Sequence, residues 1–133
     1  MKRAARAWAP VLAFAGLLFC ASSLSTVPTP HVAGFDKVEH FAAYGVLALL
    51  ACRACALSGL DPRWGLVIAS FYGVTDEVHQ AFVPGRSSDV FDWAADTLGA
   101  AAALFLFSMR RRRAALVPTG TGERAPVPVP VHD

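Results

Sequence analysis

The sequence VEHFAAYGVLALLACRACAL, residues 38–57, is twenty residues long and carries formal charge only at Glu39 and Arg53. A helix of that length rises about 30 Å, which is the thickness of the hydrocarbon core of a bilayer. Backbone polar groups in lipid must be hydrogen bonded inside a helix or a closed barrel, and this segment lacks the alternation of a barrel strand. The segment therefore predicts a transmembrane helix.

Three further apolar windows of similar length accompany it, at residues 7–24, 64–83 and 90–109. The whole chain of 133 residues is 55% hydrophobic and 17% charged, which is too apolar for an ordinary soluble domain. Short connections rich in Pro and Gly separate the windows, so consecutive helices should be antiparallel neighbours. We predict an all-α integral membrane bundle of four transmembrane helices over residues 1–113, followed by a disordered Pro-rich cytoplasmic tail over residues 114–133.

The basic residues predict how the bundle is oriented. Ten of the twelve Lys and Arg residues precede the first window, flank the second connection or follow the fourth window, and the other two are Lys37 and Arg86. Basic residues are retained on the cytoplasmic side of a membrane, so both the N and the C terminus should be cytoplasmic. The first and third connections then face outward. The first window also has the form of a secretory signal peptide, but its cleavage would leave the other three helices in the same orientation.

Polar residues gather at the outward ends of the last three windows, and each window presents them on one helical face. Residues three or four apart share a face, as Asp36 and His40 do on one helix and Asp92 and Asp96 on another. An ionised carboxylate near the bilayer centre costs about 2.5–3.5 kcal/mol, so these faces should turn toward one another. We predict an outward-facing polar pocket built from Asp36, His40, Tyr44, Asp76, Glu77, Gln80, Arg86, Asp92 and Asp96.

Three ordered motifs in the chain resemble those of a known family: Asp36-Lys37-x-x-His40-x-x-x-Tyr44, Thr75-Asp76-Glu77-x-x-Gln80-x-Phe82-x-Pro84-Gly85-Arg86-Ser87 and Asp92-x-x-x-Asp96-x-x-Gly99-Ala100. They are similar to those of the VanZ-like family of small polytopic bacterial membrane proteins, which is named for a teicoplanin-resistance protein. The resemblance covers roughly residues 35–103 and leaves the first window and the tail outside. It implies a multi-pass protein of the bacterial inner membrane and cell envelope, with the motif residues around one site. The family often has Asn at the position of Asp96.

Two functions remain open for the pocket, beside a network that only holds the helices in register. The first is recognition of an envelope lipid head group or a lipid-linked cell-wall intermediate, with a link to glycopeptide resistance. The floor would be Asp76, Glu77 and Gln80, the walls His40 and Asp92, and the mouth Arg86. The alternative is a hydrolase or transferase acting on a lipid-linked substrate, with Asp76 or Glu77 as base and His40 as its partner.

Metal ligands are present, but not at a recognisable spacing. His40 and His79, with Asp36, Asp76, Glu77 and Asp92, offer nitrogen and oxygen donors, yet they would have to come from separate helices. We therefore expect no metal and no cofactor. The expected partners are membrane lipids and lipid-linked cell-wall intermediates, with no nucleic acid. The oligomeric state is left open.

Overall fold

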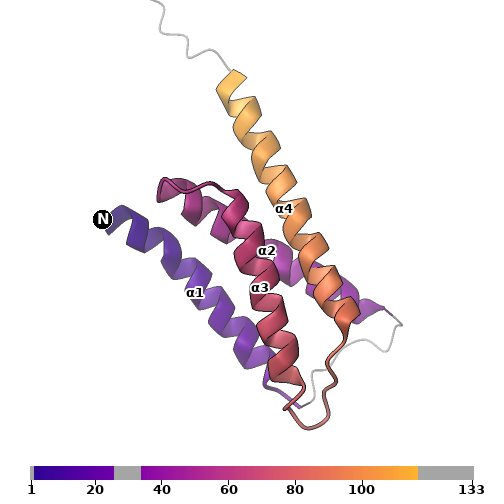
Figure 1. Cartoon of the computed structure of the whole chain (residues 1–133). Helices are drawn as coiled ribbons and strands as arrows, with labels where there is room; N and C mark the ends of the chain where they lie inside the picture. Colours follow the sequence, from indigo (N-terminus) through magenta and orange to yellow (C-terminus); the bar gives the residue numbers. More distant parts are fainter. Residues whose placement is uncertain (1, 26–33, 117–133) are drawn as a thin grey trace, which may run out of the picture.

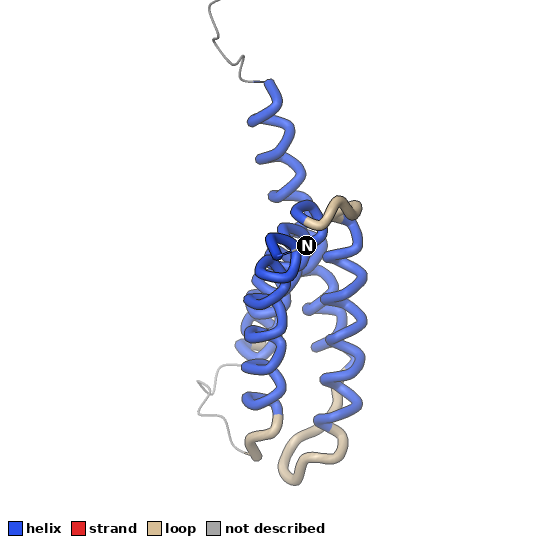
Figure 2. Tube along the Cα trace, turned by 90° about the vertical axis from the view of Figure 1, so that its left-hand side faces the viewer, coloured by secondary structure: helices blue, strands red, loops and turns tan. Residues whose placement is uncertain are grey.

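The computed structural model describes residues 2–25 and 34–116, and this part of the chain is folded into four helices without strands. The helices are α1 (Lys2–Ser22), α2 (Phe35–Leu57), α3 (Arg63–Gln80) and α4 (Val90–Leu116) (Figure 1). The start of α1, the α2–α3 turn and the end of α4 lie at one end of the bundle, and the α3–α4 loop lies at the other (Figures 1 and 2). The predicted all-α, four-helix architecture is confirmed.

Three helices end at places different from those predicted, the first being α1, which ends at Ser22, two residues early. Helix α3 ends at Gln80, three residues early, because the chain turns at once through Pro84 and Gly85, whose φ of 82° favours glycine. Helix α4 continues to Leu116, so the arginine run at 110–113 and the first residues of the predicted tail are helical. The rest of that tail, residues 117–133, lies outside the described residues, as do residues 26–33 of the first connection.

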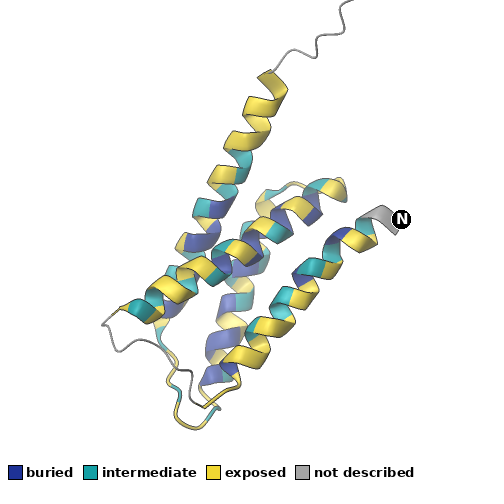
Figure 3. Cartoon of the chain, turned by 180° about the vertical axis from the view of Figure 1, so that it is seen from behind, coloured by how far each residue is buried: buried dark blue, intermediate teal, exposed yellow. Residues whose placement is uncertain are grey.

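The distribution of apolar and charged side chains is that of a bundle with a lipid-facing exterior. Three helices are long and apolar enough to cross a membrane, spanning Ala4–Ser22, Phe35–Leu57 and Val90–Leu116. Helix α3 is not among them, since its 18 residues include two carboxylates and an arginine, but its outer face is apolar, with Phe71 69% exposed. By contrast, Asp96 is 0% exposed. Exposed positions dominate the outer faces of the helices and the last turns of α4 (Figure 3).

Helix α2 is the centre of the bundle and contacts all three other helices. Its inner face is made of small, fully buried side chains, among them Ala48 and Cys52. Glycines on the neighbouring helices allow a close approach: a Cβ at Gly65 would lie 2.5 Å from the backbone nitrogen of Cys52, and one at Gly99 would overlap the carbonyl oxygen of Phe41. Close backbone packing at small residues is what holds helices together in lipid, so these contacts fix how α3 and α4 lie on α2.

Helix α1 is attached to one side of this three-helix unit. It packs on α2 and α3, and over the described residues it makes no close backbone contact with α4. The indole Nε1 of Trp8 donates a hydrogen bond to Ser58 Oγ at 3.1 Å, and the hydroxyl of Tyr72 donates one to the Ala15 carbonyl at 2.6 Å. These two bonds tie α1 to the start of the α2–α3 turn and to the middle of α3.

Candidate functional site

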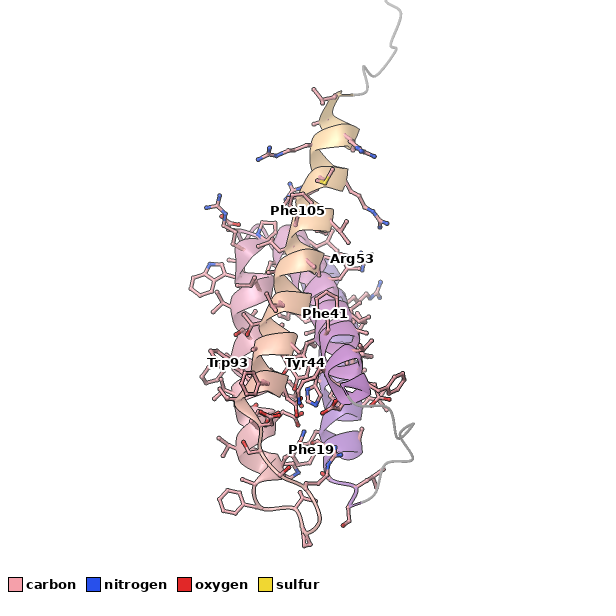
Figure 4. All side chains as sticks on the ribbon, turned by 90° about the vertical axis from the view of Figure 1, so that its right-hand side faces the viewer. Phe19, Phe41, Tyr44, Arg53, Trp93 and Phe105 are labelled. Atoms are coloured by element: carbon pink, nitrogen blue, oxygen red, sulfur yellow. The ribbon has the colours of Figure 1, made fainter. Side chains whose placement is uncertain are left out.

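A cavity of about 710 Å³ lies toward the end of the bundle that carries the α3–α4 loop. All four helices and the loop contribute to its wall. In Figure 4 the polar atoms inside the bundle gather between the levels of Tyr44 and Phe19, whereas Arg53 and Phe105 lie toward the opposite end. Apolar groups from α1 and α2 complete the lining, including Leu18, Ala21, Ala42, Ala43 and Val46.

Seven of the nine predicted site residues line this cavity: Asp36, His40, Tyr44, Asp76, Gln80, Arg86 and Asp92. The other two, Glu77 and Asp96, are buried and do not belong to the lining. The sequence analysis predicted Glu77 in the floor of the pocket, whereas the structure places it behind the cavity wall. Glu39 lines the cavity without having been predicted, although its spacing of three residues from Asp36 already placed it near that face.

Lys37 joins three carboxylates from three segments of the chain. Its Nζ donates hydrogen bonds to Asp36 Oδ2 at 2.9 Å, Asp89 Oδ2 at 2.7 Å and Asp92 Oδ1 at 2.7 Å. The hydrogen bond from this ammonium favours the ionised form of Asp89, in the loop, and holds the pKa of that carboxyl below its ordinary value. Lys37 belongs to the first motif but was not predicted as a site residue. Its role as a bridge could not be predicted from one helix alone.

His40 and Asp96 form the deepest polar contact of the site. His40 Nδ1 lies 2.9 Å from Asp96 Oδ1, and His40 Nε2 lies 3.9 Å from Asp92 Oδ2. The imidazole stacks on the ring of Tyr44 with the centroids 6.1 Å apart. One ligand atom from each of His40, Glu77 and Asp96 lies within 4.8 Å of the other two. Three helices thus converge on one group of donors, each held by its own helix.

Glu77 connects helix α3 to the loop that closes the cavity. Its Oε2 accepts hydrogen bonds from Ser88 Oγ at 3.2 Å and from the backbone N–H of Asp89 at 2.7 Å. Asp89 in turn begins α4, since its Oδ1 accepts the N–H of Phe91 at 2.9 Å, the pattern of a helix N-cap. One carboxylate therefore fixes the loop and the start of the next helix. Next to it on α3, Asp76 Oδ2 accepts a hydrogen bond from Gln80 Nε2 at 3.2 Å.

Several buried polar atoms of the site have no hydrogen-bond partner among the described residues. They are Tyr44 OH, Glu77 Oε1, Arg86 Nε and Asp96 Oδ2. A buried polar atom without a partner costs about 1–3 kcal/mol, and such atoms are rare in folded proteins. Their concentration around one cavity indicates a place that a ligand, an ion or water completes.

His79 lies away from this group. Its Nε2 is 3.0 Å from Ser23 Oγ, and its ring centroid is 4.5 Å from that of Phe19, so it is turned toward α1. It belongs neither to the cavity lining nor to the donors around His40. The set of metal ligands weighed from the sequence, which combined His40 with His79, is therefore not the set that the fold brings together.

Comparison with known families gives one result. The family model described as VanZ/LLP1 matches residues 5–111. This match confirms the predicted family and also includes α1, which lies outside the three motifs. No curated protein and no solved structure matches the chain.

Proposed function

Because the chain belongs to the VanZ/LLP1 family and is a multi-pass membrane protein with apolar helices of spanning length, we propose that its cavity binds the polar head group of an envelope lipid. In this proposal the membrane is the bacterial cytoplasmic membrane, both termini are cytoplasmic and the cavity opens to the outside. The distribution of basic residues supports this orientation, since the arginines of α4 lie at the end opposite the cavity.

The observation that carries the proposal is the mixed lining of the cavity. Carboxylates, an imidazole and a guanidinium line it together with aliphatic groups such as Leu18 and Val46. A volume of about 710 Å³ is within the range of small-molecule sites. An amphiphile whose polar head contacts the charged groups and whose chain contacts the aliphatic groups suits this lining.

Arg86 supports an anionic group on the ligand. It lines the cavity, its Nε is buried without a partner, and among the described residues it forms no ion pair, because Asp89 is held by Lys37. A free guanidinium can hold a phosphate or a carboxylate through two parallel hydrogen bonds. Among the described residues Arg86 pairs with neither Asp89 nor Glu77, which supports an anionic ligand as its partner.

The carboxylates of the lining favour a head group that also carries donors. Asp36, Glu39, Asp76 and Asp92 accept hydrogen bonds and repel a purely anionic ligand. A zwitterionic phospholipid joins a phosphate to an ammonium, and a lipid-linked cell-wall intermediate joins a phosphate to a sugar. In either head group the phosphate can bind Arg86 while the ammonium or the hydroxyls donate to the carboxylates. Binding of the second kind of lipid would provide a route to glycopeptide resistance.

Lipid analysis of the purified protein tests this function. We expect one lipid class to co-purify in mild detergent and to fall about tenfold or more in Arg86→Ala, because a hydrogen bond to a charged group contributes about 1.5–3 kcal/mol. Arg53→Ala is the matched control, since Arg53 lies toward the opposite end (Figure 4). If wild type and both variants carry the same unselected lipids, the cavity is not a lipid site.

A second candidate function rests on the pair of His40 and Asp96. A carboxylate 2.9 Å from one imidazole nitrogen orients the ring, and His40 also lines the cavity. This arrangement suits a general base in a hydrolase or transferase that acts on a lipid-linked substrate. Turnover of such a substrate by wild type, abolished in Asp96→Asn while the lipid remains bound, would establish the enzyme. Lipid retention without turnover would leave binding as the function.

A further inference from the structure

The donor atoms contributed by His40, Glu77 and Asp96 lie slightly farther apart than the ligands of a bound metal ion. One ligand atom from each residue lies within 4.8 Å of the other two, and a hydrogen bond of 2.9 Å between His40 Nδ1 and Asp96 Oδ1 orients the imidazole. Metal–ligand bonds of about 2.0–2.2 Å put neighbouring ligands about 3–4 Å apart. A small side-chain adjustment is therefore enough to close the three donors around one ion.

Unpartnered buried oxygens in the same group provide independent support. Asp96 is 0% exposed and Glu77 6% exposed, yet Asp96 Oδ2 and Glu77 Oε1 have no hydrogen-bond partner within residues 2–25 and 34–116. The other oxygen of each carboxylate is engaged, with His40 and with the loop respectively. Each buried carboxylate thus keeps one oxygen available for a ligand.

The charge around the group also calls for a cation. Lys37 is occupied by Asp36, Asp89 and Asp92. Among the described ion pairs, only the imidazole of His40 reaches Asp96, and none reaches Glu77. Burying carboxylates without a compensating charge is costly, and a divalent ion would compensate both at once.

We propose that His40, Glu77 and Asp96 together bind one divalent first-row transition metal ion, of the Zn²⁺ or Mn²⁺ class. One nitrogen donor with two carboxylates favours these ions over Mg²⁺ and Ca²⁺, which prefer oxygen donors alone. His40 lines the cavity, so the ion reaches the site from there and keeps an open coordination position on that side. The inference does not depend on which lipid, if any, the cavity binds.

Metal titration of the full-length protein in lipid-free detergent tests the site. After treatment with a chelator, wild type should bind one Zn²⁺ or Mn²⁺ per chain by calorimetry and elemental analysis. His40→Ala and Asp96→Ala should weaken binding at least about tenfold, because even outer partners of metal ligands change affinity by about 10–100-fold. The matched controls are His79→Ala and Glu39→Ala, which remove a histidine and a carboxylate outside the donor group.

A measurement on wild type alone keeps the proposal testable if a variant does not fold. Co²⁺ loaded into the chelator-treated protein should give visible absorption bands of a bound ion with nitrogen and oxygen ligands, and equimolar Zn²⁺ should remove them. Absence of stoichiometric binding by wild type would overturn the proposal, as would equal losses in His79→Ala and His40→Ala. Because no lipid is added, failure here leaves the lipid-binding proposal standing, and failure of lipid selectivity leaves the ion site standing.

Discussion

Gly73 on α3 faces the carboxylate of Asp96 on α4 so closely that a Cβ at position 73 would lie 2.7 Å from Asp96 Oδ2. The space for this carboxylate therefore exists only because position 73 has no side chain. Asp96 in turn needs this place to lie 2.9 Å from His40 Nδ1. A contact between α3 and α4 thus controls the polar contact between α4 and α2.

Replacing Gly73 with alanine should displace the Asp96 carboxylate and weaken its contact with His40. Overpacking of a well-packed interior costs about 1–3 kcal/mol, and we expect a loss of stability in that range. Thermal unfolding in detergent, followed by circular dichroism, measures it. Gly16→Ala is the control, because nothing lies within 4 Å of a Cβ there, and it should be neutral or slightly stabilising. Equal effects of the two substitutions would show that the contact at Gly73 is unimportant.

Gly99→Ala should be more damaging than Gly73→Ala. Its new methyl group would overlap the carbonyl oxygen of Phe41, a backbone atom that cannot rotate away as a carboxylate can. We expect a loss at or above the upper end of about 1–3 kcal/mol, because α2 and α4 must separate. The same unfolding assay measures it, together with the yield of monodisperse protein. A variant as stable as wild type would contradict the close packing of α2 on α4.

Lys37→Met should lower the stability of the folded protein at neutral pH. The stability of the variant should also change less on acidification than that of wild type. The pKa of Asp89 is lowered in the folded protein, so its contribution is present above the ordinary carboxyl pKa of about 4 and is lost as the pH falls through the folded value. We expect a decrease in Tm of a few degrees at pH 7, because partly exposed ion pairs each contribute little to stability. The difference from wild type should shrink toward pH 3. Arg53→Met is the control, and a difference that grows in acid would contradict the role of Lys37.

Cysteine labelling tests the orientation. In a Cys20→Ser background, which removes the exposed thiol and keeps the buried Cys52 and Cys55, Ser88→Cys should react with a membrane-impermeant maleimide added outside intact cells. Leu60→Cys, in the turn at the opposite end, should react only after the membrane is opened. The reverse pattern would place the cavity on the cytoplasmic side.

Much of the fold could be predicted from the length of the apolar windows alone. Backbone groups in lipid must be hydrogen bonded within a helix or a closed barrel, and the windows lack the alternation of barrel strands. The polar faces could also be predicted, since helical spacing alone puts His40 with Asp36 and Asp96 with Asp92. Spacing within a helix says nothing about how that helix is rotated against its neighbours. That rotation depends on contacts such as Gly99 with Phe41, which no single segment reveals.

The remaining errors have the same physical origin. His79 shares a face with Asp76 by spacing, but its Nε2 contacts Ser23, which directly follows α1. Glu77 lies one position from Asp76, and it supports the loop from behind the wall instead of lining the cavity. Lys37 was not predicted as a site residue, yet its bonds reach Asp89 and Asp92, more than fifty positions away. Such long-range partners follow from the tertiary arrangement.

Helix α1 forms one wall of the cavity, and it is attached to the bundle through α2 and α3 only, among the described helices. Helices α2, α3 and α4 contact one another in every pair, while α1 contributes Leu18 and Ala21 to the lining and, within residues 2–25 and 34–116, makes no close backbone contact with α4. Opening this wall toward the bilayer would require α1 to move, and that movement would break the hydrogen bonds of Tyr72 with Ala15 and of Ser23 with His79. The bond of Trp8 to Ser58 lies toward the other end of α1 and would not need to break.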